Sequence, residues 1–121
     1  MKRSMRALFA VSLFTLLLMA FSALTCTAVP VEITFTVDNT YGADIIVRVF
    51  SNGELQSETG SGIAYCTVNA GSVITIYDVT HHDWLDIKDG GRWVDSYPVT
   101  QSTIFRVKYN LVYSWYVEVV Y

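Results

Sequence analysis

The sequence is poor in cysteine and proline, and each shortage excludes a class of structure. Two cysteines in 121 residues, Cys26 and Cys66, are too few for a disulfide-stabilised scaffold. The two prolines, Pro30 and Pro98, lie before the first expected strand and in an expected connection, so neither interrupts a central strand. There is no Asn-x-Ser/Thr sequon, and N-glycosylation is therefore not expected.

The first 28 residues have the order of a secretory signal peptide. Three basic residues open the chain, an uncharged apolar run follows at 7–24, and small residues come before Pro30. We expect cleavage after Ala28, with residues 1–28 as the signal peptide and residues 29–121 as a single secreted domain.

The state of the two cysteines depends on this processing. Cleavage after Ala28 leaves Cys66 alone, as a small buried hydrophobic residue, whereas cleavage further upstream would permit a Cys26–Cys66 bridge. Cys26 is also the candidate for a lipid anchor, which ranks second to secretion. An uncleaved membrane anchor ranks third, because the apolar run approaches the ~20 residues that a span needs.

Basic residues are scarce after the expected cleavage. Loss of residues 1–28 removes three of the eight Lys and Arg residues and none of the 11 acidic ones, so the remaining 93 residues carry a net charge of −6. The remaining cations are isolated along the chain, whereas phosphate binding needs a clustered basic face. We therefore expect no nucleic-acid partner, no affinity for anionic lipid and no membrane insertion after the signal is removed.

After Pro30 the pattern is that of β-strands. Apolar residues alternate with Glu and Thr over 31–37, which is the period of a half-buried strand. Asn52-Gly53 between two β-rich segments predicts a hairpin, because both residues tolerate positive φ. The pattern as a whole predicts an all-β fold, a small antiparallel β-sandwich of about seven to nine strands. The further strands are expected at 45–50, 63–68, 73–79, 84–88, 93–95, 103–109 and 111–121.

The densest polar cluster lies between the expected strands at 73–79 and 84–88 and just beyond them. Its carboxylates and imidazoles are of the kind that bind zinc, but their spacing matches no tight ligand motif and no calcium loop. A solvated loop is the favoured interpretation, and we expect no metal and no cofactor. The cluster comprises Asp78, His81, His82, Asp83, Asp86 and Asp89.

No arrangement of nucleophile and base is evident in the sequence. The Gly-Ser-Gly segment at 60–62 lacks the frame of a nucleophile elbow, and Cys66 lies in an apolar strand, where a thiol stays protonated. We therefore expect no enzymatic activity. A metal-dependent hydrolase that uses His81, His82 and Asp86 ranks last among the functions.

Aromatic residues flank the polar cluster instead of being spread evenly. Aromatic walls with a few polar groups are what a pocket for a small molecule or peptide requires, although periodicity alone favours ordinary core packing. The sequence leaves open whether Trp84 lines a pocket or belongs to the core. A second alternative is an immunoglobulin-like or lectin-like sandwich that binds a protein or sugar through its loops. The residues are Tyr65, Tyr77, Trp84, Trp93 and Tyr97.

Several short motifs occur in a fixed order between residues 33 and 99. They are Asn39-Thr40, a strand end at Phe50, Gly53-Glu54, Tyr65-x-Thr67-Val68-x-x-Gly71, His82-x-Trp84-Leu85 and Lys88-Asp89. This order resembles the β domain of the von Hippel–Lindau tumour-suppressor family, which is a β-sandwich with secreted relatives. The chain departs from that family in a longer loop at 55–64 and in strands at 103–121, where the family has helices.

The resemblance implies a site for hydroxyproline, which the tumour suppressor recognises in this region. By resemblance, Tyr65 and Trp84 form the pocket walls, and His82 hydrogen-bonds the ligand's hydroxyl. Tyr77 and Asp78 fall where the family has a His-Ser pair that also contacts ligand, so Asp78 departs from the family's pattern. Polar partners of the hydroxyl would be left unsatisfied by an unmodified proline, which gives selectivity.

Taken together, these features predict a secreted, non-enzymatic binding module. We expect it to recognise a protein or peptide ligand of the hydroxyproline type, or another small polar ligand, at Tyr65, Tyr77, Asp78, His82 and Trp84. The alternative is a secreted structural or host-directed protein, an effector or inhibitor, that acts through its surface.

Overall fold

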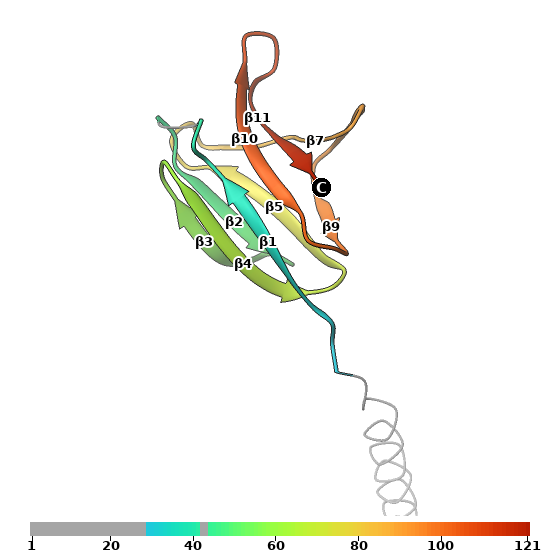
Figure 1. Ribbon diagram of the computed structural model, residues 1–121. Coiled ribbons are helices and arrows are strands. Elements are labelled where there is room, and N and C mark those ends of the chain that lie inside the picture. The colour runs from blue at the N-terminus through green and yellow to red at the C-terminus, as the bar shows by residue number, and fades with distance from the viewer. Residues whose placement is uncertain (1–28, 42–43) are drawn as a thin grey trace, which may run out of the picture. The chain divides into compact units, whose positions relative to one another are not determined.

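The computed structural model describes residues 29–41 and 44–121 (Figure 1). The expected signal peptide at residues 1–28, Cys26 included, lies outside these described residues. All strands belong to one compact unit, Val31–Tyr121. Within the described part of the chain, no helix is long and apolar enough to cross a membrane.

The structure is all-β, as the alternating pattern predicts. Among the residues that the structure describes, seven strands have five or more residues, and four short ones have two or three. They are β1 (Glu32–Asp38), β2 (Val47–Ser51), β3 (Glu54–Thr59), β4 (Ile63–Asn69), β5 (Ser72–Asp78), β6 (Asp83–Trp84), β7 (Ile87–Asp89), β8 (Arg92–Val94), β9 (Tyr97–Val99), β10 (Ile104–Asn110) and β11 (Ser114–Val120). The total exceeds the expected seven to nine because the short strands leave little periodicity in the sequence.

The strands form two sheets that pack as a small β-sandwich. The six-stranded sheet has the order β4-β1-β10-β11-β7-β8. The five-stranded sheet has the order β3-β2-β5-β6, and β9 also pairs with β5. Most pairs are antiparallel, but β1 pairs with β10 and β11 with β7 in parallel. These two parallel pairs depend on long connections, which strand periodicity does not report.

The core lies between the two sheets and follows the alternation of the strands. In β1, Ile33, Phe35 and Val37 are buried, and the intervening residues are not. Phe35 packs edge-on against Phe105 of β10, with ring centroids 5.4 Å apart. Side chains from both sheets contribute to the same apolar cluster. Burial of these side chains is the main stabilising contribution to the fold.

Three local expectations need correction. The segment expected as a loop at 55–64 contains strand β3, which is mostly exposed on both faces and therefore lacks alternating hydrophobicity. The strand expected at 111–121 begins only at Ser114, because residues 111–113 form a turn. Pro98 lies within β9, where it pairs with Val73 at the edge of β5, a position that needs no N–H donor.

The expected Asn-Gly hairpin is confirmed. Asn52 and Gly53 have φ values of 50° and 82° and connect β2 to β3. Asn52 also ties the hairpin to β5, since its backbone N–H donates to Val73 O at 2.9 Å and its Oδ1 accepts from Val73 N at 2.8 Å.

Candidate functional site

A cavity of about 360 Å³ lies where the two sheets meet at β6 and β11. The five-stranded sheet contributes the end of β5 and all of β6, and the six-stranded sheet contributes the start of β11. Its volume falls in the range of small-molecule sites. The lining residues are Asp78, His81, Asp83, Trp84, Leu85, Asp86, Tyr113, Ser114 and Trp115.

The connection that crosses between the sheets is held at both ends. Leu85 N donates to Ile76 O of β5 at 2.9 Å, and Val117 N of β11 donates to Asp86 O at 2.9 Å. Residues 85 and 86 thus bridge both sheets through backbone hydrogen bonds, which fixes the wall of the cavity that they form.

Trp84 is a surface side chain with a defined orientation. It is 59% exposed, and its ring contacts Tyr77 and Phe50 at centroid distances of 5.0 and 5.4 Å. Such aromatic contacts restrict a side chain without burying it. Of the two positions that the sequence left open, Trp84 takes the one outside the core and lines the cavity.

Asp78 is the buried acid of the cavity. It is 1% exposed, and its side chain organises the turn after β5. Asp78 Oδ1 accepts from His81 N at 3.1 Å, and Oδ2 lies 2.7 Å from His81 Nδ1. Both carboxylate oxygens are therefore used within the fold, and His81, whose side chain is 51% exposed, presents the rest of its ring to the cavity.

The five predicted site residues do not meet in one pocket. Asp78 and Trp84 line the cavity, and Tyr77 supports Trp84 from the outer face of the five-stranded sheet. His82 is exposed, has a φ of 57° and is absent from the lining. Tyr65 is 73% exposed on β4, in the other sheet. Tyr65 and Trp84, the expected pocket walls, thus lie on different sheets.

The lining contains three residues that the sequence did not assign to a site. Tyr113, Ser114 and Trp115 lie far along the chain from Trp84 and reach it through the order of strands in the six-stranded sheet. In the sequence, all three belong to the strand expected at 111–121. No local signal distinguishes a strand that lines a cavity from one that covers a core.

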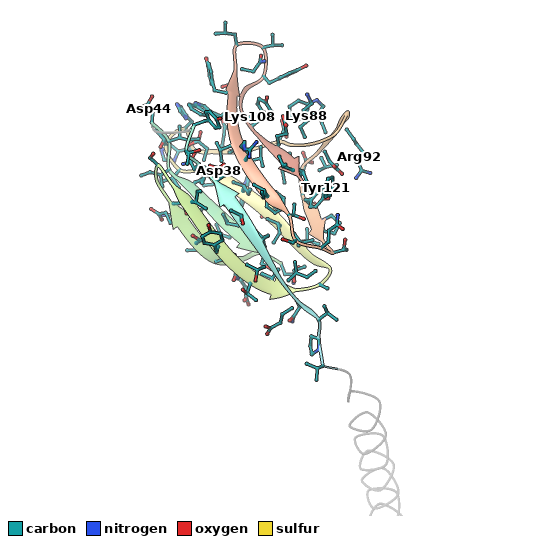
Figure 2. The ribbon with its side chains drawn as sticks, viewed as in Figure 1. Asp38, Asp44, Lys88, Arg92, Lys108 and Tyr121 are labelled. Carbon is teal, nitrogen blue, oxygen red and sulfur yellow. The ribbon has the colours of Figure 1, made fainter. Side chains whose placement is uncertain are left out.

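The polar cluster of the sequence is divided by the fold. Four of its members line the cavity, while Asp89 lies on β7 and belongs to another set of contacts. Asp89 Oδ1 accepts from the Tyr121 hydroxyl at 2.8 Å, and Oδ2 lies 3.7 Å from Arg92 Nη2. Figure 2 labels Tyr121 and Arg92. Over residues 29–41 and 44–121, no three His, Cys, Asp or Glu side chains are grouped to hold a metal ion.

The chemistry of the cavity is acidic and aromatic. Its lining residues include three Asp, one His, two Trp and one Tyr, and none of the described residues that line it is Lys or Arg. Such a surface suits a ligand that offers hydrogen-bond donors or positive charge beside an apolar ring. The thiol of Cys66 is remote from this chemistry, because it is buried in the core, where desolvation raises its pKa.

Comparisons of this chain with protein-family models, with curated proteins and with solved structures found no match. The likeness to the von Hippel–Lindau β domain accordingly stays a prediction from the motifs of the sequence.

Proposed function

We propose that this chain is a secreted, non-enzymatic binding module whose ligand site is the cavity beside Trp84. The observation that carries the proposal is an exposed indole, fixed by two aromatic neighbours, next to carboxylates in a cavity of about 360 Å³. Secretion is supported by the signal-peptide pattern of residues 1–28.

The ligand class follows from the lining. An apolar ring or chain packs on the Trp84 indole, and a hydroxyl or ammonium group donates to Asp83 or Asp86. Hydroxyproline has such a ring and hydroxyl, and a lysine side chain has the ammonium alternative. A proline offers no donor and leaves the carboxylates without that partner.

Titration calorimetry with three peptides of one sequence tests this proposal. The peptides differ at a single position, which is proline, hydroxyproline or lysine. We expect saturable binding of a donor-bearing peptide, weaker binding of the proline peptide, and loss of binding in Trp84→Ala. Trp93→Ala is the matched control, since Trp93 is also partly exposed but does not line this cavity.

His82→Ala separates the cavity from the site implied by resemblance. His82 does not line the cavity, so its removal should leave binding unchanged, whereas the resemblance expects a loss. No binding of any of the three peptides, or equal loss in Trp84→Ala and Trp93→Ala, would contradict the proposal.

A further inference from the structure

The β10–β11 hairpin ends in an exposed apolar turn. Figure 1 shows this hairpin extending beyond the rest of the sandwich. At its turn Leu111 is 92% exposed and Val112 is 83% exposed. The stretch from 109 to 117 contains no charged residue. Two adjacent aliphatic side chains are thus presented to solvent, and nothing in residues 29–41 and 44–121 covers them.

The turn has a defined conformation that holds these side chains outward. Asn110 pairs with Ser114 across the hairpin, and Asn110 Oδ1 accepts from Val112 N at 2.7 Å. Ser114, with a φ of 64°, provides the left-handed residue that closes the three-residue turn. Exposure of Leu111 and Val112 is therefore imposed by the turn geometry.

An aromatic layer lies behind the turn. Trp93 contacts Tyr113 and Tyr116 at centroid distances of 4.9 and 5.4 Å. Tyr109 contacts Trp115 at 5.0 Å. Tyrosine and tryptophan combine an apolar ring with a polar atom, and they concentrate where an apolar phase meets water.

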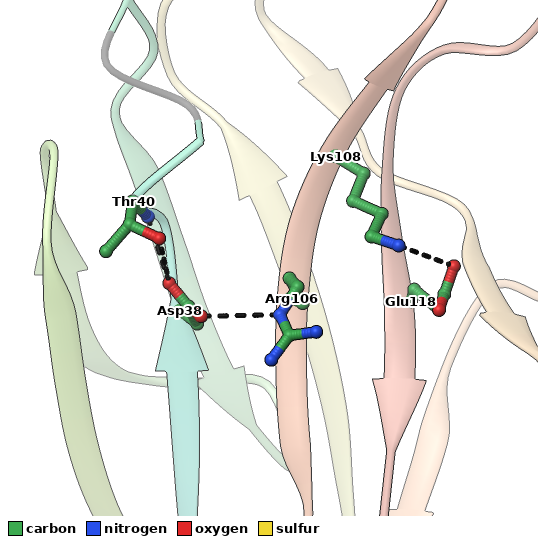
Figure 3. Close-up of polar contacts among 5 residues, drawn as sticks. All are labelled: Asp38, Thr40, Arg106, Lys108 and Glu118. Carbon is green, nitrogen blue, oxygen red and sulfur yellow. Dashed lines mark hydrogen bonds and ion pairs between the residues drawn. The ribbon is translucent and has the colours of Figure 1, made fainter.

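Charged side chains lie within the aromatic layer and behind it, since Lys108 is opposite Tyr116 and Lys88 is opposite Trp93 in the strand registers. Lys108 Nζ lies 3.2 Å from Glu118 Oε2, and Arg106 Nε lies 3.4 Å from Asp38 Oδ2 (Figure 3). Figure 2 labels Lys88 and Lys108 beside the hairpin, and Lys88 Nζ lies 5.9 Å from the Trp93 ring centroid. Positive and negative groups thus alternate at this level.

We propose that the hairpin turn docks on a zwitterionic phospholipid surface and inserts Leu111 and Val112 into it. The aliphatic tip, followed by aromatic side chains with paired charges among and behind them, matches the order of acyl chain and then interface with zwitterionic headgroups across a lipid leaflet. The ion pairs complement phosphate and choline together. The net charge of −6 over residues 29–121 opposes an anionic surface. This inference departs from the sequence-based expectation of no membrane insertion, and its aromatic layer shares Tyr113 and Trp115 with the lining of the cavity beside Trp84.

Co-sedimentation with phosphatidylcholine vesicles tests the proposal. We expect the protein to partition onto them, with less bound when part of the phosphatidylcholine is replaced by phosphatidylserine. Leu111→Ser combined with Val112→Ser should weaken partitioning by about tenfold or more, since the water-to-lipid transfer of two aliphatic side chains is lost. Leu55→Ser is the matched control, because Leu55 is 54% exposed on β3 of the other sheet.

Three results would overturn the proposal. The first is no partitioning onto phosphatidylcholine, and the second is tighter binding as phosphatidylserine is added, which would indicate electrostatic adsorption. The third is concentration-dependent dimerisation in analytical ultracentrifugation that the double variant abolishes, which would assign the turn to self-association. Tryptophan fluorescence of the double variant, unchanged in the absence of vesicles, establishes that it is folded.

Discussion

At the residue scale, polar side chains that make several hydrogen bonds or ion pairs hold neighbouring segments of the chain together. Asp38 accepts from Thr40 N at 3.0 Å and from Thr40 Oγ1 at 2.7 Å, and it pairs with Arg106 of β10 (Figure 3). Burial alone would raise the pKa of Asp38, but the hydrogen bonds from Thr40 and the Arg106 guanidinium outweigh it and lower the pKa below 3.8.

The Asp38 contacts predict that part of the free energy of unfolding depends on the ionised state of this carboxylate and is lost in acid. A lowered pKa in the folded state means that the unfolded chain binds the proton more readily, so the contribution is complete above about pH 4 and is lost as pH falls further. We expect Asp38→Asn to lower the free energy of unfolding at pH 7, with the difference from the parent chain shrinking below about pH 4. Urea unfolding at a series of pH values measures this, and a difference that stays constant down to about pH 2 would contradict it.

At the scale of elements, local sequence chemistry succeeds where one face of a strand is buried. The alternation of Ile33, Phe35 and Val37 correctly predicts β1, and Asn52-Gly53 correctly predicts the β2–β3 hairpin. The same reasoning misses β3, whose residues are polar and mostly exposed, because a strand without a buried face carries no period. The same reasoning wrongly predicts residues 111–113 as part of a strand, since Leu, Val and Tyr favour strands even where the chain turns.

Asn39 connects elements that are distant in sequence. Its side chain is fully buried at the end of β1, and Nδ2 donates to Ile45 O at 3.0 Å and to Gly60 O at 2.9 Å. The backbone N–H of Asn39 donates to Gly62 O at 2.8 Å. One residue thus holds the segment before β2 and the turn between β3 and β4 against β1.

Asn39→Ala tests this connection. Removing the amide leaves the carbonyl of Ile45, which is buried, and that of Gly60, which is partly buried, without their donor. We therefore expect a loss of about 2 kcal/mol in the free energy of unfolding. Asn69→Ala is the control, because Asn69 is exposed on β4, and it should change stability by less than about 0.5 kcal/mol. Equal effects of the two substitutions in urea unfolding would show that Asn39 has no connecting role.

At the scale of the whole molecule, the two-sheet arrangement separates residues that stabilise the fold from residues that are free to bind. Phe35 is fully buried between the sheets, whereas Trp84 is 59% exposed. Both are large aromatic residues in β-strands; the alternation over 31–37 predicts that Phe35 is on a buried face, whereas the sequence around Trp84 leaves its position open.

This separation predicts different costs for two similar truncations. Phe35→Ala should lower the free energy of unfolding by about 3–5 kcal/mol, because it removes a core ring and leaves a cavity. Trp84→Ala should cost about 1 kcal/mol, the value of its contacts with Tyr77 and Phe50. Chemical unfolding of the two variants measures both values. A cost for Trp84→Ala as large as that of Phe35→Ala would mean that the indole belongs to the core.

The sequence by itself determined the fold class, the single compact β unit after Pro30 and most strands, because these depend on local period and turn chemistry. It also identified Trp84, Asp78 and the neighbouring polar residues as candidates for a site. Only the tertiary structure decided which residues from distant parts of the chain meet at the cavity. Tyr113 and Trp115 line the cavity and Tyr65 does not, because the strand order and the parallel pairing bring together segments that no local pattern relates.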